Sequence, residues 1–126
     1  MSYIVSNVDA LDQTDLVGSH SCVALVQHYA KVPNTALWRE GKTVKGNLLV
    51  AKGTAIATFV NGKYPNKDHG NHAAFYVSQD VNGIWVVDQF KKAQKVSKRY
   101  IRSKGKSADG KFLDPSNNAD AFSVIE

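Results

Sequence analysis

Residues 72–90 read HAAFYVSQDVNGIWVVDQF, which is two apolar runs on either side of the turn signal Asn82-Gly83. Runs of β-branched and aromatic residues that flank an Asn-Gly pair are typical of a β-hairpin. Residues 54–60 form a similar run that ends at another Asn-Gly pair, and residues 96–102 and 121–125 are two further candidate strands. From Gly46 onward, the sequence therefore predicts an antiparallel sheet.

The first third of the chain has a helical pattern instead. A helix is expected to begin at Cys22, with Ser19 or Ser21 as its N-cap, and to end near Lys31. A second, shorter helix is predicted over residues 34–40, with a stop at Gly41. Helices that precede a run of strands indicate an α+β fold, with the N-terminal helices packed on a C-terminal antiparallel β-sheet.

The length and composition indicate one globular unit. The chain has 126 residues, 43% of them hydrophobic, which is enough to bury a core without disulfides. We expect a single domain over residues 1–126. Residues 1–9 lack the basic segment and apolar stretch of a signal peptide, and no apolar run approaches membrane-spanning length, so we expect synthesis in the cytoplasm and no membrane insertion.

The net charge of +5 is concentrated near the C-terminus. Nine of the sixteen Lys and Arg residues lie between Lys91 and Lys111, with Asp109 as the only acidic residue among them. This basic region could attract any polyanion, or it could be an ordinary solvated surface. No zinc-finger spacing, phosphate-binding glycine loop or RNA-binding signature accompanies it, so we expect no specific nucleic-acid partner.

The only cysteine and a histidine fifty residues later are the best clue to chemistry. Cys22 stands where the first helix begins and His72 where a strand begins. A helix N-terminus and a nearby imidazolium can lower a cysteine pKa from about 8.5 to as low as about 3.5, which produces a reactive thiolate. The backbone N–H groups of the same helix end could stabilise an oxyanion. These features predict Cys22 as the nucleophile and His72 as its base.

A third group should orient the imidazole, and Asp88 is the candidate. A tight turn at Asn82-Gly83 would make Asp88 point away from the His72 face. A five-residue loop from Gln79 to Gly83 would instead pair residue 74 with Asp88 and bring Asp88 onto that face, and a bulge is the alternative way to reach it. In that register Gln89 faces the other way, so the triad prediction requires the loop or the bulge.

Each of these residues also has a purely structural reading. Free cysteine is commonly a small buried apolar residue, and His72 could be a hydrogen-bonded histidine at a strand end. Asp68, His69 and His72, with Asp88 or Cys22, could bind a metal, but the pattern lacks the second paired element of a zinc motif. We therefore expect neither a metal nor a cofactor.

Other histidine and aromatic side chains are expected to line the cleft, lie at the surface or pack in the core. His20 could line a cleft beside the cysteine, whereas His28 is expected at the surface. Trp38, Trp85 and Tyr64 are expected to pack in the core or at its rim.

The order of these residues, a Cys at a helix start, a His at a strand start and a polar residue on the next strand, resembles the papain-like superfamily, particularly its NlpC/P60 and CHAP-type cell-wall amidases. More narrowly, the chain resembles the small amidase effectors delivered by bacterial type VI secretion. The segments that carry this resemblance are GSHSCVALVQ (18–27), LWREG (37–41), GTAIATF (53–59) and GNHAAFY (70–76).

The resemblance implies a cysteine hydrolase that cuts peptide-stem or cross-link amides of peptidoglycan in the periplasm of a target bacterium. It also implies export through the type VI secretion apparatus, a cognate immunity protein that blocks the cleft, and a Cys22, His72 and Asp88 triad. The chain departs from papain in lacking a glutamine shortly before the cysteine, so the second oxyanion donor is unassigned, with the Cys22 amide, His20 and Ser21 as candidates.

Two other functions remain open from the sequence. One is a binding module in which Cys22 is core and the basic region binds nucleic acid or protein. The other keeps the papain-like site but acts on proteins as a deamidase or transglutaminase.

Overall fold

The computed structural model of the chain describes residues 2–126. One α-helix and six strands are present in this range: α1 Cys22–Ala30, β1 Glu40–Thr43, β2 Ala55–Thr58, β3 Ala73–Asp80, β4 Gly83–Asp88, β5 Ser97–Arg102 and β6 Phe122–Ile125. Short 3-10 helices cover Val8–Leu11, Thr35–Leu37, Pro115–Asn117 and Ala119–Ala121. The predicted α+β class is confirmed, with one helix and a six-stranded antiparallel sheet.

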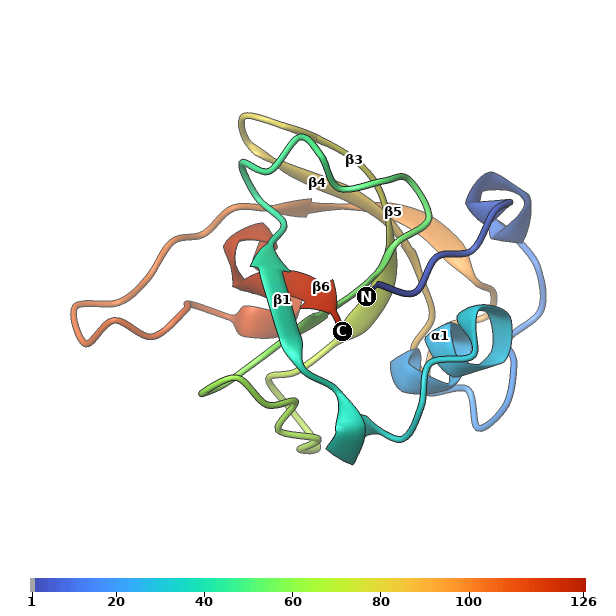
Figure 1. The fold of residues 1–126 in the computed structure, drawn as a ribbon. Coiled ribbons are helices and arrows are strands. Elements are labelled where there is room, and N and C mark those ends of the chain that lie inside the picture. The colour runs from blue at the N-terminus through green and yellow to red at the C-terminus, as the bar shows by residue number, and fades with distance from the viewer. Residues whose placement is uncertain (1) are drawn as a thin grey trace.

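The six strands form one sheet in the order β1-β6-β2-β3-β4-β5, and every neighbouring pair is antiparallel. The last strand, β6, thus lies between β1 and β2, far from its neighbours in sequence. Figure 1 shows α1 at one side of the curved sheet and the long loop that follows β5 at the other.

The α1 helix begins where the sequence predicts. The Ser21 hydroxyl accepts a hydrogen bond from the Ala24 N–H (3.2 Å), which satisfies one of the free donors of the first turn. The helix ends at Lys31, which takes a left-handed conformation (φ 59°). In residues 2–126, no helix is long and apolar enough to cross a membrane.

Both faces of the sheet are covered by packed side chains. Ala55 and Ala57 of β2 belong to one buried cluster, together with Leu25 and Val26 of α1. Ile56, which points the opposite way, belongs to a second buried cluster on the other face. Burial on both faces explains why β2 and most of β3 are apolar at consecutive positions rather than at alternate ones.

The second predicted helix, over residues 34–40, is wrong. Only Thr35–Leu37 turns, as a 3-10 helix, and β1 begins at Glu40. The reason is a long-range pairing: the Arg39 N–H donates to the Glu126 carbonyl (2.7 Å), and the Glu126 N–H donates back (2.8 Å). Pairing with the end of the chain outweighs the local helical preference here.

The predicted hairpin between β3 and β4 is confirmed, but neither a tight turn at Asn82-Gly83 nor a five-residue loop over residues 79–83 forms. The β3–β4 hairpin turns at Val81-Asn82, with Asp80 opposite Gly83, and the Asp80 carboxylate accepts hydrogen bonds from the Asn82 and Gly83 N–H groups. A β-bulge between Tyr76 and Ser78 then shifts the register, so that Phe75 faces Val87. Continued by one residue, this register puts Asp88 beside Ala74, as the bulge alternative predicts.

Candidate active site

Cys22 is the first residue of α1 and is partly exposed. Because the first N–H groups of a helix have no partner within the helix, this end is electropositive and suits a thiolate. Cys22 is not sealed in the core, so the reading of this cysteine as a buried apolar residue is wrong.

His72 is fixed at the sheet end from which β3 starts. Its backbone N–H donates to the Thr58 hydroxyl (3.0 Å), and its carbonyl accepts from the Thr58 N–H (3.0 Å). The residue is 7% exposed, and its ring packs edge-on against Phe122. Hydrogen bonds to β2 and contact with β6 therefore hold the ring in place.

Asp88, the last residue of β4, is 1% exposed and contacts the imidazole directly. The His72 Nε2 lies 2.7 Å from Asp88 Oδ2. Arg99 of β5 approaches the same carboxylate, with Nε 2.8 Å and Nη2 2.8 Å from Oδ2. Since Nε2 is occupied by Asp88, Nδ1 is the ring nitrogen left to face Cys22.

These contacts stabilise charge on Asp88 and His72. Burial raises the pKa of Asp88, but hydrogen bonds from His72 and Arg99 outweigh it, and the pKa lies below its ordinary value. Burial lowers the pKa of His72, but hydrogen bonding to Asp88 and to Cys22 reverses this and raises the pKa to about 9. His72 is therefore protonated at neutral pH.

The charge on His72 in turn affects the pKa of Cys22. Burial raises the pKa of the Cys22 thiol, but the hydrogen bond with His72 and the His72 charge outweigh it, helped by the Ala73 N–H and the Tyr64 hydroxyl. The net pKa is lowered. A thiolate beside an imidazolium is the reactive ion pair of a cysteine nucleophile.

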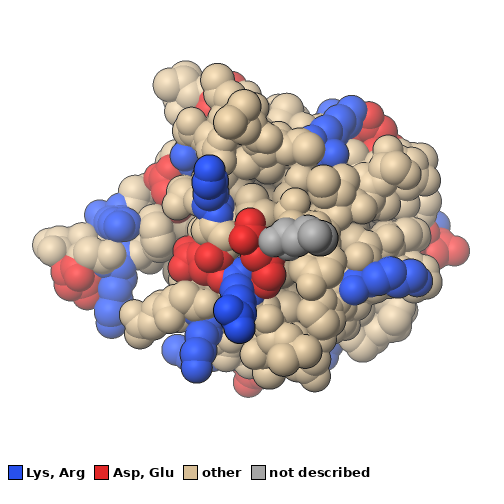
Figure 2. All heavy atoms as spheres, viewed as in Figure 1, with Lys and Arg blue, Asp and Glu red and all other residues tan. Residues whose placement is uncertain are grey.

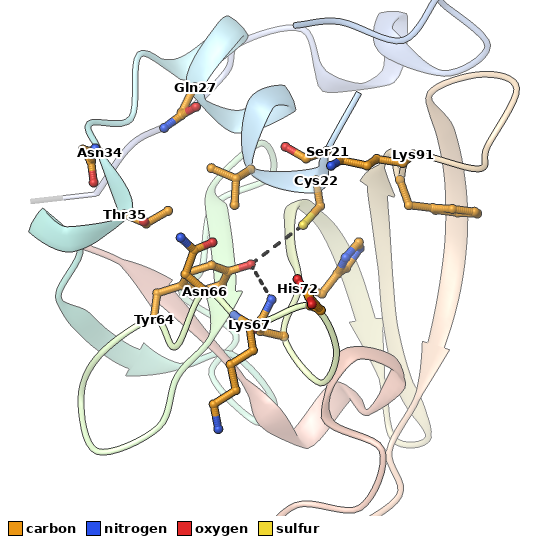
Figure 3. A pocket seen from close by; sticks show the side chains of 14 residues that line it. Ser21, Cys22, Gln27, Asn34, Thr35, Tyr64, Asn66, Lys67, His72 and Lys91 are labelled. Carbon is orange, nitrogen blue, oxygen red and sulfur yellow. Dashed lines mark hydrogen bonds between the residues drawn. The ribbon is translucent and has the colours of Figure 1, made fainter. Parts of the chain in front are cut away.

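The pair opens into a cavity of about 580 Å³. Figure 3 shows the Cys22 sulfur pointing into this space, with the Tyr64 hydroxyl on one side and the His72 ring on the other. The cavity is lined by Ser21, Cys22, Val23, Gln27, Asn34, Thr35, Tyr64, Asn66, Lys67, Asp68, Asn71, His72, Phe90 and Lys91. The sulfur is accessible to a substrate of modest size.

Gln89 links β4 to the loop that precedes Cys22. It is fully buried; its Oε1 accepts from the Val17 N–H (2.9 Å), and its Nε2 donates to the Val17 carbonyl (3.0 Å) and the Ser21 carbonyl (2.7 Å). Gln89 faces away from His72, as the sequence predicts for this register. It binds the loop that leads into Cys22 rather than the imidazole.

The other candidates do not contact Cys22 or Asp88. Asp68 lines the cavity around Cys22, and Asp68 and His69 both line an adjacent cavity of about 510 Å³ on the His72 side. Within residues 2–126, no group of three His, Cys, Asp or Glu side chains could hold a metal ion. His20 is exposed and does not line the cavity around Cys22, and His28 is exposed as predicted.

Sequence reasoning missed three site residues: Arg99, Tyr64 and Gln89 in its positioning role. Arg99 lies opposite Val86 and diagonal to Asp88. Knowledge of the β4–β5 register would therefore have identified Arg99 as a neighbour of Asp88. Tyr64 lies in a loop, where no periodic pattern indicates side-chain direction.

Three comparisons relate the chain to known proteins. The family model described as "Dae2: Domesticated amidase effector 2" matches residues 2–125. A "Type VI secretion amidase effector 2 protein" of Salmonella typhi is 47% identical over 133 aligned positions, covering 100% of both chains. A "Domesticated amidase effector 2" of Ixodes scapularis is 37% identical, covering 87% of this chain and 73% of its own length.

The fold has a solved counterpart. A structure described as "Type 6 secretion amidase effector 2 (Tae2)" superposes with a TM-score of 0.92 at 48% identity, covering 98% of this chain and 94% of that one.

Proposed function

This chain belongs to the domesticated amidase effector 2 family, and we propose that it is an antibacterial amidase that hydrolyses amide bonds of peptidoglycan. Relatives named as type VI secretion amidase effectors cover the whole chain and share its fold. The observation that carries the proposal is the 2.7 Å hydrogen bond between His72 and Asp88. The pKa of His72 is raised, and His72 in turn lowers the pKa of Cys22.

In this proposal the three residues act in sequence. The Cys22 thiolate attacks the amide carbon, and the protonated His72 gives its proton to the leaving amine, which leaves a thioester on the sulfur. His72 then takes a proton from water, the hydroxide attacks the thioester, and the C–S bond breaks to release a carboxylic acid and Cys22. Asp88 keeps the imidazolium oriented and stabilised throughout.

The biological setting is part of the proposal. Residues 1–126 would act as one papain-like domain of the NlpC/P60 kind, exported by the type VI secretion apparatus and active in the periplasm of a target bacterium. A cognate immunity protein would block the cavity at Cys22.

The direct test incubates purified peptidoglycan with the wild-type protein and with Cys22→Ala, and compares the soluble fragments by mass spectrometry. We expect a new cleavage product with the wild type alone. His72→Ala should also lose the product, whereas His28→Ala, at an exposed position on the same helix as Cys22, should keep it.

Two outcomes would count against the amidase. Identical fragment profiles for wild type and Cys22→Ala would remove hydrolysis at this site. Release of ammonia from glutamine-containing proteins, with peptidoglycan left intact, would indicate a deamidase built on the same residues.

A further inference from the structure

Tyr64 is held rigidly beside the nucleophile. Its ring packs against Trp38, with centroids 4.8 Å apart, and both side chains are buried. Trp38 is itself fixed, because its indole N–H donates to the Pro33 carbonyl (2.8 Å). The Tyr64 hydroxyl oxygen lies 3.8 Å from the Cys22 sulfur, the contact drawn as a dashed line in Figure 3.

Asn71 determines where the Tyr64 proton points. The Asn71 Oδ1 lies 2.6 Å from the backbone N–H of Lys67, which can only donate. The amide is therefore oriented with its Nδ2 toward Tyr64, where it donates to the hydroxyl oxygen at 3.2 Å. Because that oxygen accepts from Asn71, its own proton is available to the Cys22 side.

We propose that the Tyr64 hydroxyl is the second oxyanion donor of this site, aimed by Asn71 at the carbonyl oxygen of the group attached to Cys22. The proposal rests on the hydrolytic function above and concerns how the same site stabilises the intermediate. Its partner donor is the backbone N–H of Cys22, in the first turn of α1.

Tyr64 keeps its proton while the intermediate forms and collapses. When the sulfur attacks, the C–S bond forms and the carbonyl π electrons move onto oxygen, which takes a negative charge next to the sulfur. Tyr64 donates a hydrogen bond to this oxygen. When the intermediate collapses, the C=O bond re-forms, the C–N bond breaks, and the amine takes its proton from His72.

The protonation state of Tyr64 fits a donor role. Burial raises the pKa of the Tyr64 hydroxyl, and the charge on Cys22 raises it further. A phenol with a raised pKa keeps its proton at neutral pH, so it can donate a hydrogen bond but cannot serve as the base.

The test separates oxyanion stabilisation from thiolate stabilisation by using two reagents. Iodoacetamide alkylates Cys22 by displacement, without forming an oxyanion. The ester para-nitrophenyl acetate acylates Cys22 through a tetrahedral oxyanion and releases a coloured burst. The readout is the ratio of the acylation rate constant to the alkylation rate constant, which cancels any change in the thiolate fraction.

For Tyr64→Phe we expect this ratio to fall about 100- to 1000-fold, as for loss of one oxyanion donor, and peptidoglycan cleavage to fall in kcat with little change in KM. Asn71→Asp should lower the ratio as well, although it keeps the tyrosine. A carboxylate accepts the Tyr64 proton and turns it away from the sulfur.

Tyr76→Phe is the matched control. Tyr76 is equally buried, but its hydroxyl accepts from Gln79 (3.1 Å) and it belongs to the cluster on the other face of the sheet. Its loss should lower the melting temperature while leaving the ratio unchanged.

An unchanged ratio in Tyr64→Phe, or equal falls in both rate constants, would overturn the proposal and limit Tyr64 to packing or to thiolate stabilisation. If Tyr64→Phe does not fold, an unchanged ratio in Asn71→Asp overturns it instead. This test is independent of the peptidoglycan assay. If the ester acylates the wild-type protein but peptidoglycan stays intact, the proposal that peptidoglycan is the substrate is refuted, whereas the proposal that Tyr64 is an oxyanion donor is not.

Discussion

At the scale of single residues, four ionisable groups in the site depend on one another. His72 and Arg99 lower the pKa of Asp88, Asp88 raises the pKa of His72, and His72 lowers the pKa of Cys22. Removal of one member therefore changes the pKa of the next one, so the titrations of this chain of groups are coupled.

This chain predicts a bell-shaped pH profile for kcat/KM of amide hydrolysis. The acidic limb follows the lowered pKa of Cys22, because a protonated thiol is a poor nucleophile. The alkaline limb is expected near pH 9, where His72 loses the proton that it must give to the leaving amine. Initial rates of fragment release, measured from acidic to alkaline pH, check both limbs.

Asp88→Asn is the sharpest variant of that experiment. It keeps an oxygen beside His72 but removes the charge, so the pKa of His72 should move down toward its ordinary value of about 6.5. The alkaline limb should move with it, and iodoacetamide should alkylate Cys22 more slowly at mildly acidic pH. An unshifted alkaline limb in this variant would show that Asp88 does not control His72.

At the scale of elements, the last residue of β4 and the residue that follows it contact two different parts of the site. Asp88 points to the imidazole, and the next residue, Gln89, points to the loop before α1. Alternation along an extended chain places the two side chains on opposite sides. The chain at the end of β4 thus contacts both the imidazole and the loop that leads into Cys22.

Replacement of Gln89 by leucine tests whether Gln89 affects only the stability of the fold or also the position of Cys22. The Val17 N–H and the Val17 and Ser21 carbonyls would lose their partners, at about 1–3 kcal/mol for each group left unsatisfied. We expect a lower free energy of unfolding in urea, together with slower Cys22 alkylation and slower amide hydrolysis, because the loop before Cys22 is no longer tied to β4.

Gln79→Leu serves as its control. Gln79 makes a comparable set of hydrogen bonds, to the Val44 and Asn47 carbonyls, the Tyr76 hydroxyl and the Gly46 N–H, but far from the nucleophile. It should lose stability with normal Cys22 reactivity. Normal alkylation in folded Gln89→Leu would reduce Gln89 to a purely stabilising residue.

At the scale of the whole molecule, the site forms where the two buried clusters meet. Cys22 packs against the cluster shared with α1, whereas His72 contacts Phe122 of the cluster on the opposite face of the sheet. The cavity therefore opens at the sheet end where β3 begins, and residues from both layers reach it.

The basic region, Lys91 to Lys111, comprises β5 and the loops on either side of it. Part of its charge is used internally, since Lys95 pairs with Asp15, Arg99 with Asp88, and Lys104 with Asp114. On the face drawn in Figure 2, Lys and Arg are interspersed with Asp and Glu. If this region binds the cell wall, we expect exposed lysines such as Lys92 and Lys106 to make the contacts.

Changing Lys92 and Lys106 to glutamine should weaken binding to insoluble, anionic cell wall at low salt. The expected effect is about fivefold per lysine, from about 1 kcal/mol per cation at an anionic surface, and it should shrink as salt screens the charges. Hydrolysis of soluble wall fragments should not change. Pelleting assays over a salt series measure the binding.

Lys42 and Lys63, two exposed lysines outside the region, provide the control pair for the same substitution. An equal loss of binding with that pair would point to net charge alone. Unchanged binding in the Lys92 and Lys106 variant would leave the region as a solvated surface.

The sequence was most informative where patterns are local. The N-cap at Ser21 and the start of the helix at Cys22 follow from neighbouring residues, and the strand runs follow from β-branched and aromatic composition. Residues 34–40 were misjudged because their partner, Glu126, lies at the other end of the chain.

Local sequence, then, determined the α+β class and the placement of Cys22 at a helix start and of His72 at a strand start, because capping and strand propensity act between near neighbours. Only the tertiary structure decided that Asp88 reaches His72, since this depends on a bulge at Val77 that shifts the register by one residue. It alone also brought in Arg99, Gln89 and Tyr64, whose contacts join segments remote in sequence and so leave no periodic trace along the chain.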